Sequence, residues 1–172
     1  MKSQKGLIGW VVLGILALCL ITGGFLVIFS HDSLPGDWVY PIKEITENLK
    51  LAVNELSFEG RADVYLDMSE ERSSELNQLV KGRNKEKEII ETLDRLKEQQ
   101  DRALNNLERA RSKGVNVTNL LNKLEANLQK QQTIFPELSY QVVGSASEAL
   151  QKALSNSGET LSKVENLKIN QR

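Results

Sequence analysis

Few side chains in this 172-residue sequence have the types and spacing that catalysis or metal binding requires. His31 is the single histidine and Cys19 the single cysteine, so one chain cannot assemble a His/Cys zinc site. Glu86, Glu88 and Glu91 could ligate Ca²⁺, but lysines interleave them, and a solvated helix face is the better interpretation. The sequence has no nucleophile elbow, phosphate-binding loop or catalytic triad. We therefore expect no catalytic residue, no cofactor and no metal, and predict that the protein is not an enzyme.

A run of 23 residues without a charged side chain, residues 7–29, is the longest apolar segment. As a helix it would span about 34 Å, which is enough to cross the hydrocarbon core of a bilayer. Lys2 and Lys5 precede the run, and the next lysine or arginine is Lys43. Because positive charge is retained in the cytoplasm, we expect residues 1–6 to be cytoplasmic and the polar remainder extracytoplasmic. The sequence thus predicts a single-pass protein of the cell membrane.

Proteolytic processing of this segment is an alternative that the sequence leaves open. A signal peptidase needs small residues just before its cut, and the end of the run, residues 25–29, offers none. Lipoprotein processing would use Cys19, but Leu18 stands where a small residue is usual. We expect an uncleaved anchor.

The chain after the run is densely charged but nearly balanced, with 20 lysines and arginines against 23 aspartates and glutamates. This balance argues against nucleic acid or an anionic membrane surface as its partner. The partners we expect are the membrane itself and either an envelope protein or a second copy of the chain.

Residues 41–165 are predicted to form an all-α bundle. Good helix formers dominate this stretch, and strand-like alternation is missing from it. Apolar residues recur at steps of three and four in five segments. The first segment begins at Pro41 and carries the stripe Ile42, Ile45, Leu49, Ala52 and Leu56. The other four stripes lie at residues 62–79, 89–110, 117–135 and 143–153, and the last continues weakly to Val164.

Local signals mark the ends of these segments. Ser57 is a suitable N-cap for the second helix, Gly114 ends the third, and Pro136 ends or kinks the fourth. Short connections make consecutive helices antiparallel neighbours. The predicted fold class is all-α, one N-terminal transmembrane helix followed by an antiparallel bundle of about five helices, with a frayed tail at residues 166–172.

A juxtamembrane segment, residues 30–40, connects the run to the bundle. Pro35 and Gly36 suit positions i+1 and i+2 of a type II turn. Trp38 and Tyr40 could form an aromatic binding patch; alternatively, they hold this segment on the bundle or lie at the lipid interface.

The stretch Leu34–Lys43 resembles the start of the DUF5667 family, a bacterial domain of unknown function that opens roughly as L-P-G-D-x-x-Y-P-x-K. The matching positions are Leu34, Pro35, Gly36, Asp37, Tyr40, Pro41 and Lys43. Segments around Arg72 and Glu75 and around Gln131 are similar to later family segments, although Gln131 replaces a histidine. The resemblance covers residues 34–154. It implies an envelope location beside a membrane-spanning helix and supplies no activity.

Some relatives look like membrane-anchored regulators of sigma factors, which carry a cytoplasmic zinc module before the span. Residues 1–6 hold no such module here, so that role is not carried over.

Polar residues interrupt three of the predicted stripes. Arg72 occupies an apolar position, and a buried guanidinium needs a carboxylate partner. Glu44 or Glu47 on the preceding helix could pair with it, and Glu75 lies one turn further along the same helix. The alternative is that Arg72 lies at the edge of the stripe and its side chain reaches into water. In two other stripes, Gln100 and Gln131 could hydrogen-bond to each other in the core or line a small groove.

Together these features predict a non-enzymatic, membrane-anchored extracytoplasmic helical module for protein–protein interaction or envelope scaffolding. The alternative is a sensory or regulatory extracytoplasmic domain that acts through a membrane partner.

Overall fold

The computed structural model describes residues 13, 30, 32–83 and 85–169. Across these residues the chain is helical and contains no strand, which confirms the predicted all-α class. Apart from Leu13, the predicted cytoplasmic N-terminus and transmembrane run lie outside the described residues. None of the helices in the described part is both long and apolar enough to cross a membrane.

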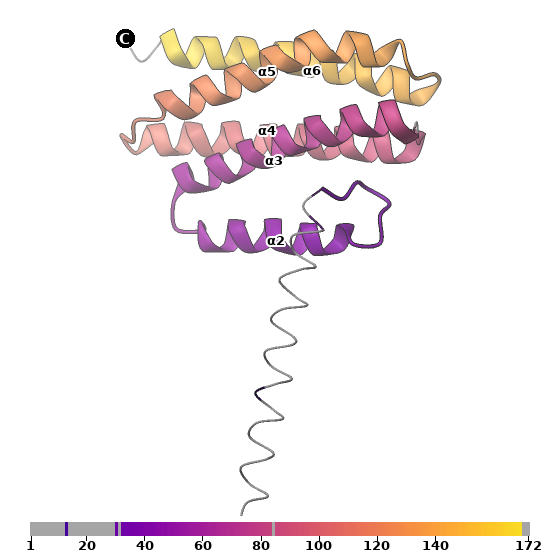
Figure 1. The fold of residues 1–172 in the computed structure, drawn as a ribbon. Coiled ribbons are helices and arrows are strands. Elements are labelled where there is room, and N and C mark those ends of the chain that lie inside the picture. The colour runs from indigo at the N-terminus through magenta and orange to yellow at the C-terminus, as the bar shows by residue number, and fades with distance from the viewer. Residues whose placement is uncertain (1–12, 14–29, 31, 84, 170–172) are drawn as a thin grey trace, which may run out of the picture. The chain divides into compact units, whose positions relative to one another are not determined.

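Five α-helices and one π-helical turn follow one another along the described chain (Figure 1). They are α2 (Tyr40–Val53), α3 (Phe58–Gln78), η1 (Leu79–Arg83), α4 (Glu86–Ser112), α5 (Thr118–Ser139) and α6 (Ser145–Ile169). The contacts divide the chain into two compact units, residues 1–46 and 47–172, and each is described by itself. The boundary between the units falls inside α2.

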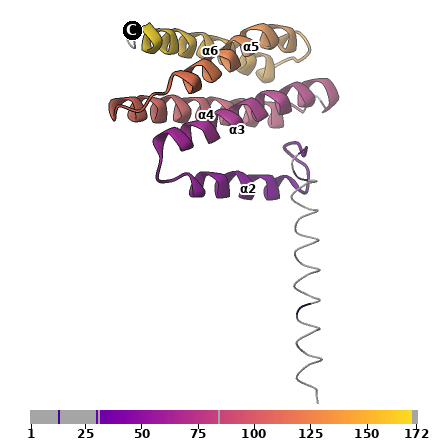
Figure 2. The ribbon, with the colours of Figure 1, turned by 60° about the vertical axis from the view of Figure 1, so that its left-hand side comes forward.

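The second unit contains two helical hairpins. The α3–α4 hairpin forms one layer and the α5–α6 hairpin forms the other, as Figures 1 and 2 both show. Each hairpin has a short connection, so its two helices run antiparallel, as predicted. The apolar stripes of all four helices meet in one core, which includes Leu66, Leu107, Leu121, Leu124, Leu128 and Val164.

Several helix ends lie where local signals place them. The side chain of Ser57 accepts a hydrogen bond from the N–H of Gly60 at 3.1 Å, which confirms it as the N-cap of α3. Gly114 has a φ of 81° just beyond α4, a conformation that favours glycine at a helix end. Pro136 does not end α5, because the helix continues to Ser139.

The last helix is longer than the sequence predicts. α6 continues without a break to Ile169, beyond the expected limit of the bundle at residue 165. Val164 is fully buried, and Lys168 forms an ion pair with Glu125 of α5 at 2.6 Å. The structure thus differs from the predicted tail at residues 166–169, which continue α6 as helix; residues 170–172 lie outside the described residues.

The predicted apolar stripe of α2 is present, but it faces away from the core. Ile45, Leu49, Ala52 and Leu56 are exposed. Glu47 is buried instead, and Leu51 is half-buried against the core. Residues 47 and 49 are about 200° apart around a helix. A helix that directs Glu47 inward therefore turns Leu49 outward.

Candidate functional site

The most deeply buried charged group of the second unit is the guanidinium of Arg72 on α3. It donates hydrogen bonds to the carboxylate of Glu47 on α2 and to that of Glu75 one turn along its own helix. All three side chains are at most 7% exposed. The predicted cross-helix ion pair with Glu47 is therefore confirmed, and the alternative of a guanidinium reaching into water is wrong.

Burial shifts the acid–base behaviour of this cluster. Desolvation raises the pKa of Glu47 above its ordinary value, and the attraction of Arg72 opposes this shift only in part. The negative charges of Glu71 and Glu75 raise the pKa of Glu47 further. Arg72 thus links α2 and α3 through buried, charge-assisted hydrogen bonds to two carboxylates.

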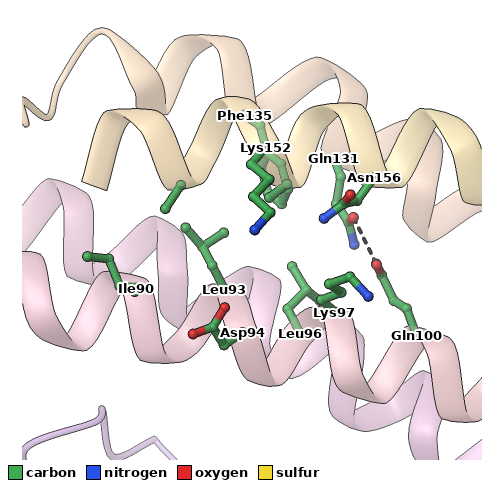
Figure 3. Close-up of a pocket in the computed structure, with 12 residues that line it drawn as sticks. Ile90, Leu93, Asp94, Leu96, Lys97, Gln100, Gln131, Phe135, Lys152 and Asn156 are labelled. Atoms are coloured by element: carbon green, nitrogen blue, oxygen red, sulfur yellow. Dashed lines mark hydrogen bonds between the residues drawn. The ribbon is translucent and has the colours of Figure 1, made fainter. Parts of the chain in front are cut away.

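The second polar cluster joins three helices inside the core. Gln100 of α4 donates a hydrogen bond from Nε2 to Oε1 of Gln131 on α5 at 2.8 Å, as drawn in Figure 3. The amide nitrogen of Gln131 in turn lies 3.2 Å from the hydroxyl of Ser73 on α3. The predicted contact between the two glutamines is confirmed. A buried bridge of this kind favours one register of the helices over others.

A groove of about 200 Å³ opens beside this glutamine pair, between α4, α5 and α6 (Figure 3). Its wall is mainly apolar and consists of Ile90, Leu93, Leu96, Phe135, Ala149 and Ala153. Charged and amide side chains surround it: Asp94 and Lys97 from α4, and Lys152 and Asn156 from α6. An apolar hollow with a polar rim is typical of places where a protein accepts a side chain of a partner.

The groove lacks the composition of a catalytic or metal site. It contains no histidine, cysteine or serine, and its carboxylate, Asp94, has no second acid beside it among the lining residues. Within residues 32–83 and 85–169, no three metal-ligating side chains gather in one place. Its apolar wall and polar rim are suited to binding an apolar group.

The first unit contains the motif that carries the family resemblance. The N–H of Asp37 donates to the carbonyl of Leu34 at 2.9 Å, and Gly36 has a φ of 90°. Together these confirm the type II turn at Pro35 and Gly36. A second hydrogen bond joins the same two residues in the opposite direction. The N–H of Leu34 donates to the side-chain carboxylate of Asp37 at 2.8 Å.

The two aromatic residues of this segment do not act as a pair. Trp38 is exposed and Tyr40 is buried, so a binding patch that uses both side chains is wrong. Pro41 lies exposed in the first turn of α2, and Lys43 is buried. The decapeptide thus serves mainly to build the turn and begin α2.

Sequence reasoning did not find the groove itself. Asp94, Lys152 and Asn156 flank apolar stripes on two helices about sixty positions apart, and nothing local marks them as neighbours. The one signal was Gln100 and Gln131, for which a small groove was the alternative to a core contact. Both interpretations hold, since the pair bonds in the core and also lines the groove.

A known family matches most of the chain. The family described as "Domain of unknown function (DUF5667)" matches residues 32–171, a wider range than the residues 34–154 covered by the resemblance in the sequence. The match includes the whole of α6. No curated protein and no solved structure matches the chain.

Proposed function

The chain belongs to the DUF5667 family, and on that premise we propose that it is a non-enzymatic, single-pass membrane protein whose extracytoplasmic helical bundle docks a protein partner of the cell envelope. The observation that carries the docking role is the apolar groove between α4, α5 and α6. The proposed membrane location and orientation rest on the uncharged run at residues 7–29 and on Lys2 and Lys5 before it.

The groove has the size and chemistry to accept one apolar side chain of an amphipathic segment. Leu93 and Phe135 offer apolar surface to that side chain, while the two small residues Ala149 and Ala153 leave room for it. Figure 3 shows Lys152 of α6 reaching toward α4, where it could pair with a carboxylate of the partner. We therefore propose a partner helix with an apolar anchor and an acidic residue one turn away.

Rigid surroundings favour such a site. The bridge from Gln100 through Gln131 to Ser73 holds three helices in register directly beside the groove. At the end of the α5–α6 connection, the carboxylate of Glu86 on α4 accepts hydrogen bonds from the backbone and hydroxyl of Ser145. A preformed pocket loses little conformational entropy when a partner binds.

The test is site-specific photocrosslinking of the full-length protein in intact cells, with the photoreactive residue at position 156 on the rim of the groove. We expect one discrete crosslinked species, and we expect Ala153→Arg to abolish it by filling the groove. Ala126→Arg is the matched control, because Ala126 is an exposed alanine of α5 outside the groove. Circular dichroism of both variants confirms that the bundle is folded.

A crosslinked species that persists in the Ala153→Arg variant would show that the groove is not the docking site. Equal loss in both variants would indicate a general effect of added charge and would also contradict the proposal.

A further inference from the structure

We infer that the outer face of α2, formed by Leu49, Val53 and the following Leu56, lies on the surface of the lipid bilayer. The inference rests on the membrane anchoring proposed above. It concerns a surface other than the α4–α6 groove, and a partner of a different kind.

The outer face of α2 is unusually apolar for a surface that the protein leaves uncovered. Leu49 is 62% exposed, Val53 75% and Leu56 102%. Ile45, one turn earlier in the same helix, is 67% exposed. Ile45, Leu49 and Val53 follow at steps of four, so they form one continuous stripe along the helix. Scattered exposed leucines are normal in soluble proteins, but an aligned stripe marks an interaction surface.

The opposite side of α2 is occupied, so the stripe cannot turn inward. Glu47 is buried in its ion pair with Arg72. Leu51 packs against the hydrophobic core. Rotating α2 to bury Leu49 would break this pair and leave the Arg72 guanidinium short of a carboxylate inside the protein, which is very costly.

The length of chain before α2 decides in favour of lipid as the occupant. Only ten residues separate the end of the apolar run at Phe29 from the start of α2 at Tyr40. Fully extended, ten residues reach about 35 Å. The segment is not extended, because hydrogen bonds from Ser33 to Ser30, from Asp37 to Leu34 and from Tyr40 to Asp37 fold it into successive turns. If the run spans the bilayer, α2 must begin close to its surface.

The sequence on either side of α2 is suited to a bilayer interface. Trp38, exposed just before α2, is of the type enriched where a membrane meets water. An amphipathic helix in this plane buries its apolar face among the headgroups and acyl chains. Lys50 is the basic residue of the last turn, and the acidic Glu55 follows it. Binding should therefore depend on apolar burial and little on the charge of the headgroups.

The experiment uses full-length protein carrying Cys19→Ser and Val53→Cys, labelled with the environment-sensitive fluorophore NBD and reconstituted into phosphatidylcholine vesicles. We expect a blue-shifted emission that lipids with a spin label near the headgroup quench several-fold more strongly than they quench the same label at Ala126→Cys. Replacing a third of the lipid with phosphatidylglycerol should change the quenching less than two-fold. Leu49→Ser with Leu56→Ser should reduce the quenching at position 53.

Two results would overturn the inference. One is emission at position 53 like that of position 126, with no quenching by lipid. The other is a blue shift that grows with the protein-to-lipid ratio and is insensitive to spin-labelled lipid, because this would assign the stripe to a second copy of the chain.

Alkaline carbonate extraction of the same vesicles separates this inference from the proposal on which it rests. Release of the protein would contradict the anchor, whatever the label at position 53 reports. Retention together with a water-like label at position 53 would contradict the α2 inference alone.

Discussion

Arg72 of α3 and Glu47 of α2 form a buried ion pair across 25 positions of sequence. This pair determines which side of α2 faces the protein and which side carries exposed leucines. Glu75 shares the same guanidinium. We therefore expect this cluster to affect the stability of the protein, the pH dependence of that stability and the orientation of α2.

Removal of Arg72 should be among the most damaging single changes to this protein. Arg72→Ala leaves Glu47 and Glu75 buried without their common partner, and we expect a loss of about 3–5 kcal/mol in the free energy of unfolding. Guanidinium denaturation followed by circular dichroism measures this. Lys130→Ala, which removes an exposed pair with Glu70 at 3.6 Å, is the control and should cost less than about 0.5 kcal/mol. A similar small cost for Arg72→Ala would rule out a structural role for its pair.

The raised pKa of Glu47 predicts a pH dependence of stability. Between the ordinary carboxyl value of 4.5 and the higher folded pKa, the folded protein holds a proton on Glu47 that the unfolded chain releases. The stability contributed by Glu47 is thus fully present below the unfolded pKa and is lost as pH rises through the folded pKa. Since Glu47→Gln resembles the protonated form, its stability relative to the natural protein should increase as pH rises through this window. Denaturation at a series of pH values measures the difference, and a decrease with rising pH would contradict the predicted direction.

The glutamine bridge should show strong coupling between its members. Gln131→Ala removes the partner of Gln100 and of the Ser73 hydroxyl, and we expect a cost of about 1–3 kcal/mol. The double change Gln100→Leu with Gln131→Leu should cost clearly less than the sum of the single changes Gln100→Leu and Gln131→Leu, because no unpaired amide remains. A double-mutant cycle measures the coupling, with the exposed Gln129→Ala as control. Simple additivity would show that the two amides act independently.

The end of α6 should contribute to the stability of the bundle. Val164 is fully buried against the core, so Val164→Ala should lower the free energy of unfolding by about 1–3 kcal/mol through lost burial and a small cavity. The neighbouring Lys163→Ala is exposed and should have little effect. Equal thermal midpoints for the two variants would indicate that this end of the helix frays in solution.

Much of the fold follows from local patterns. The stripes of α3 and α4 predict which residues are buried, including the polar members Arg72 and Gln100. Ser57 and Gly114 mark helix ends through hydrogen bonding and backbone conformation that depend on only a few neighbouring residues. The turn at Pro35 and Gly36 is predictable for the same reason.

The candidate site is less predictable because it depends on distant neighbours. Lys152 and Asp94 line one groove only because α6 packs on α4 beside the Gln100–Gln131 bridge. The continuation of α6 to Ile169 likewise depends on contacts such as that between Lys168 and Glu125.

By itself, the sequence determined the helices, the turn before α2, the family and the residues able to pair in the core, because each of these depends on spacing along one segment. The tertiary structure alone decided the direction in which α2 faces and the existence of the groove. An apolar stripe records that a helix has an apolar side, but not what covers that side. In α2 the buried charge of Arg72 required a carboxylate, Glu47 supplied it from the polar side, and the apolar side was left to face outward.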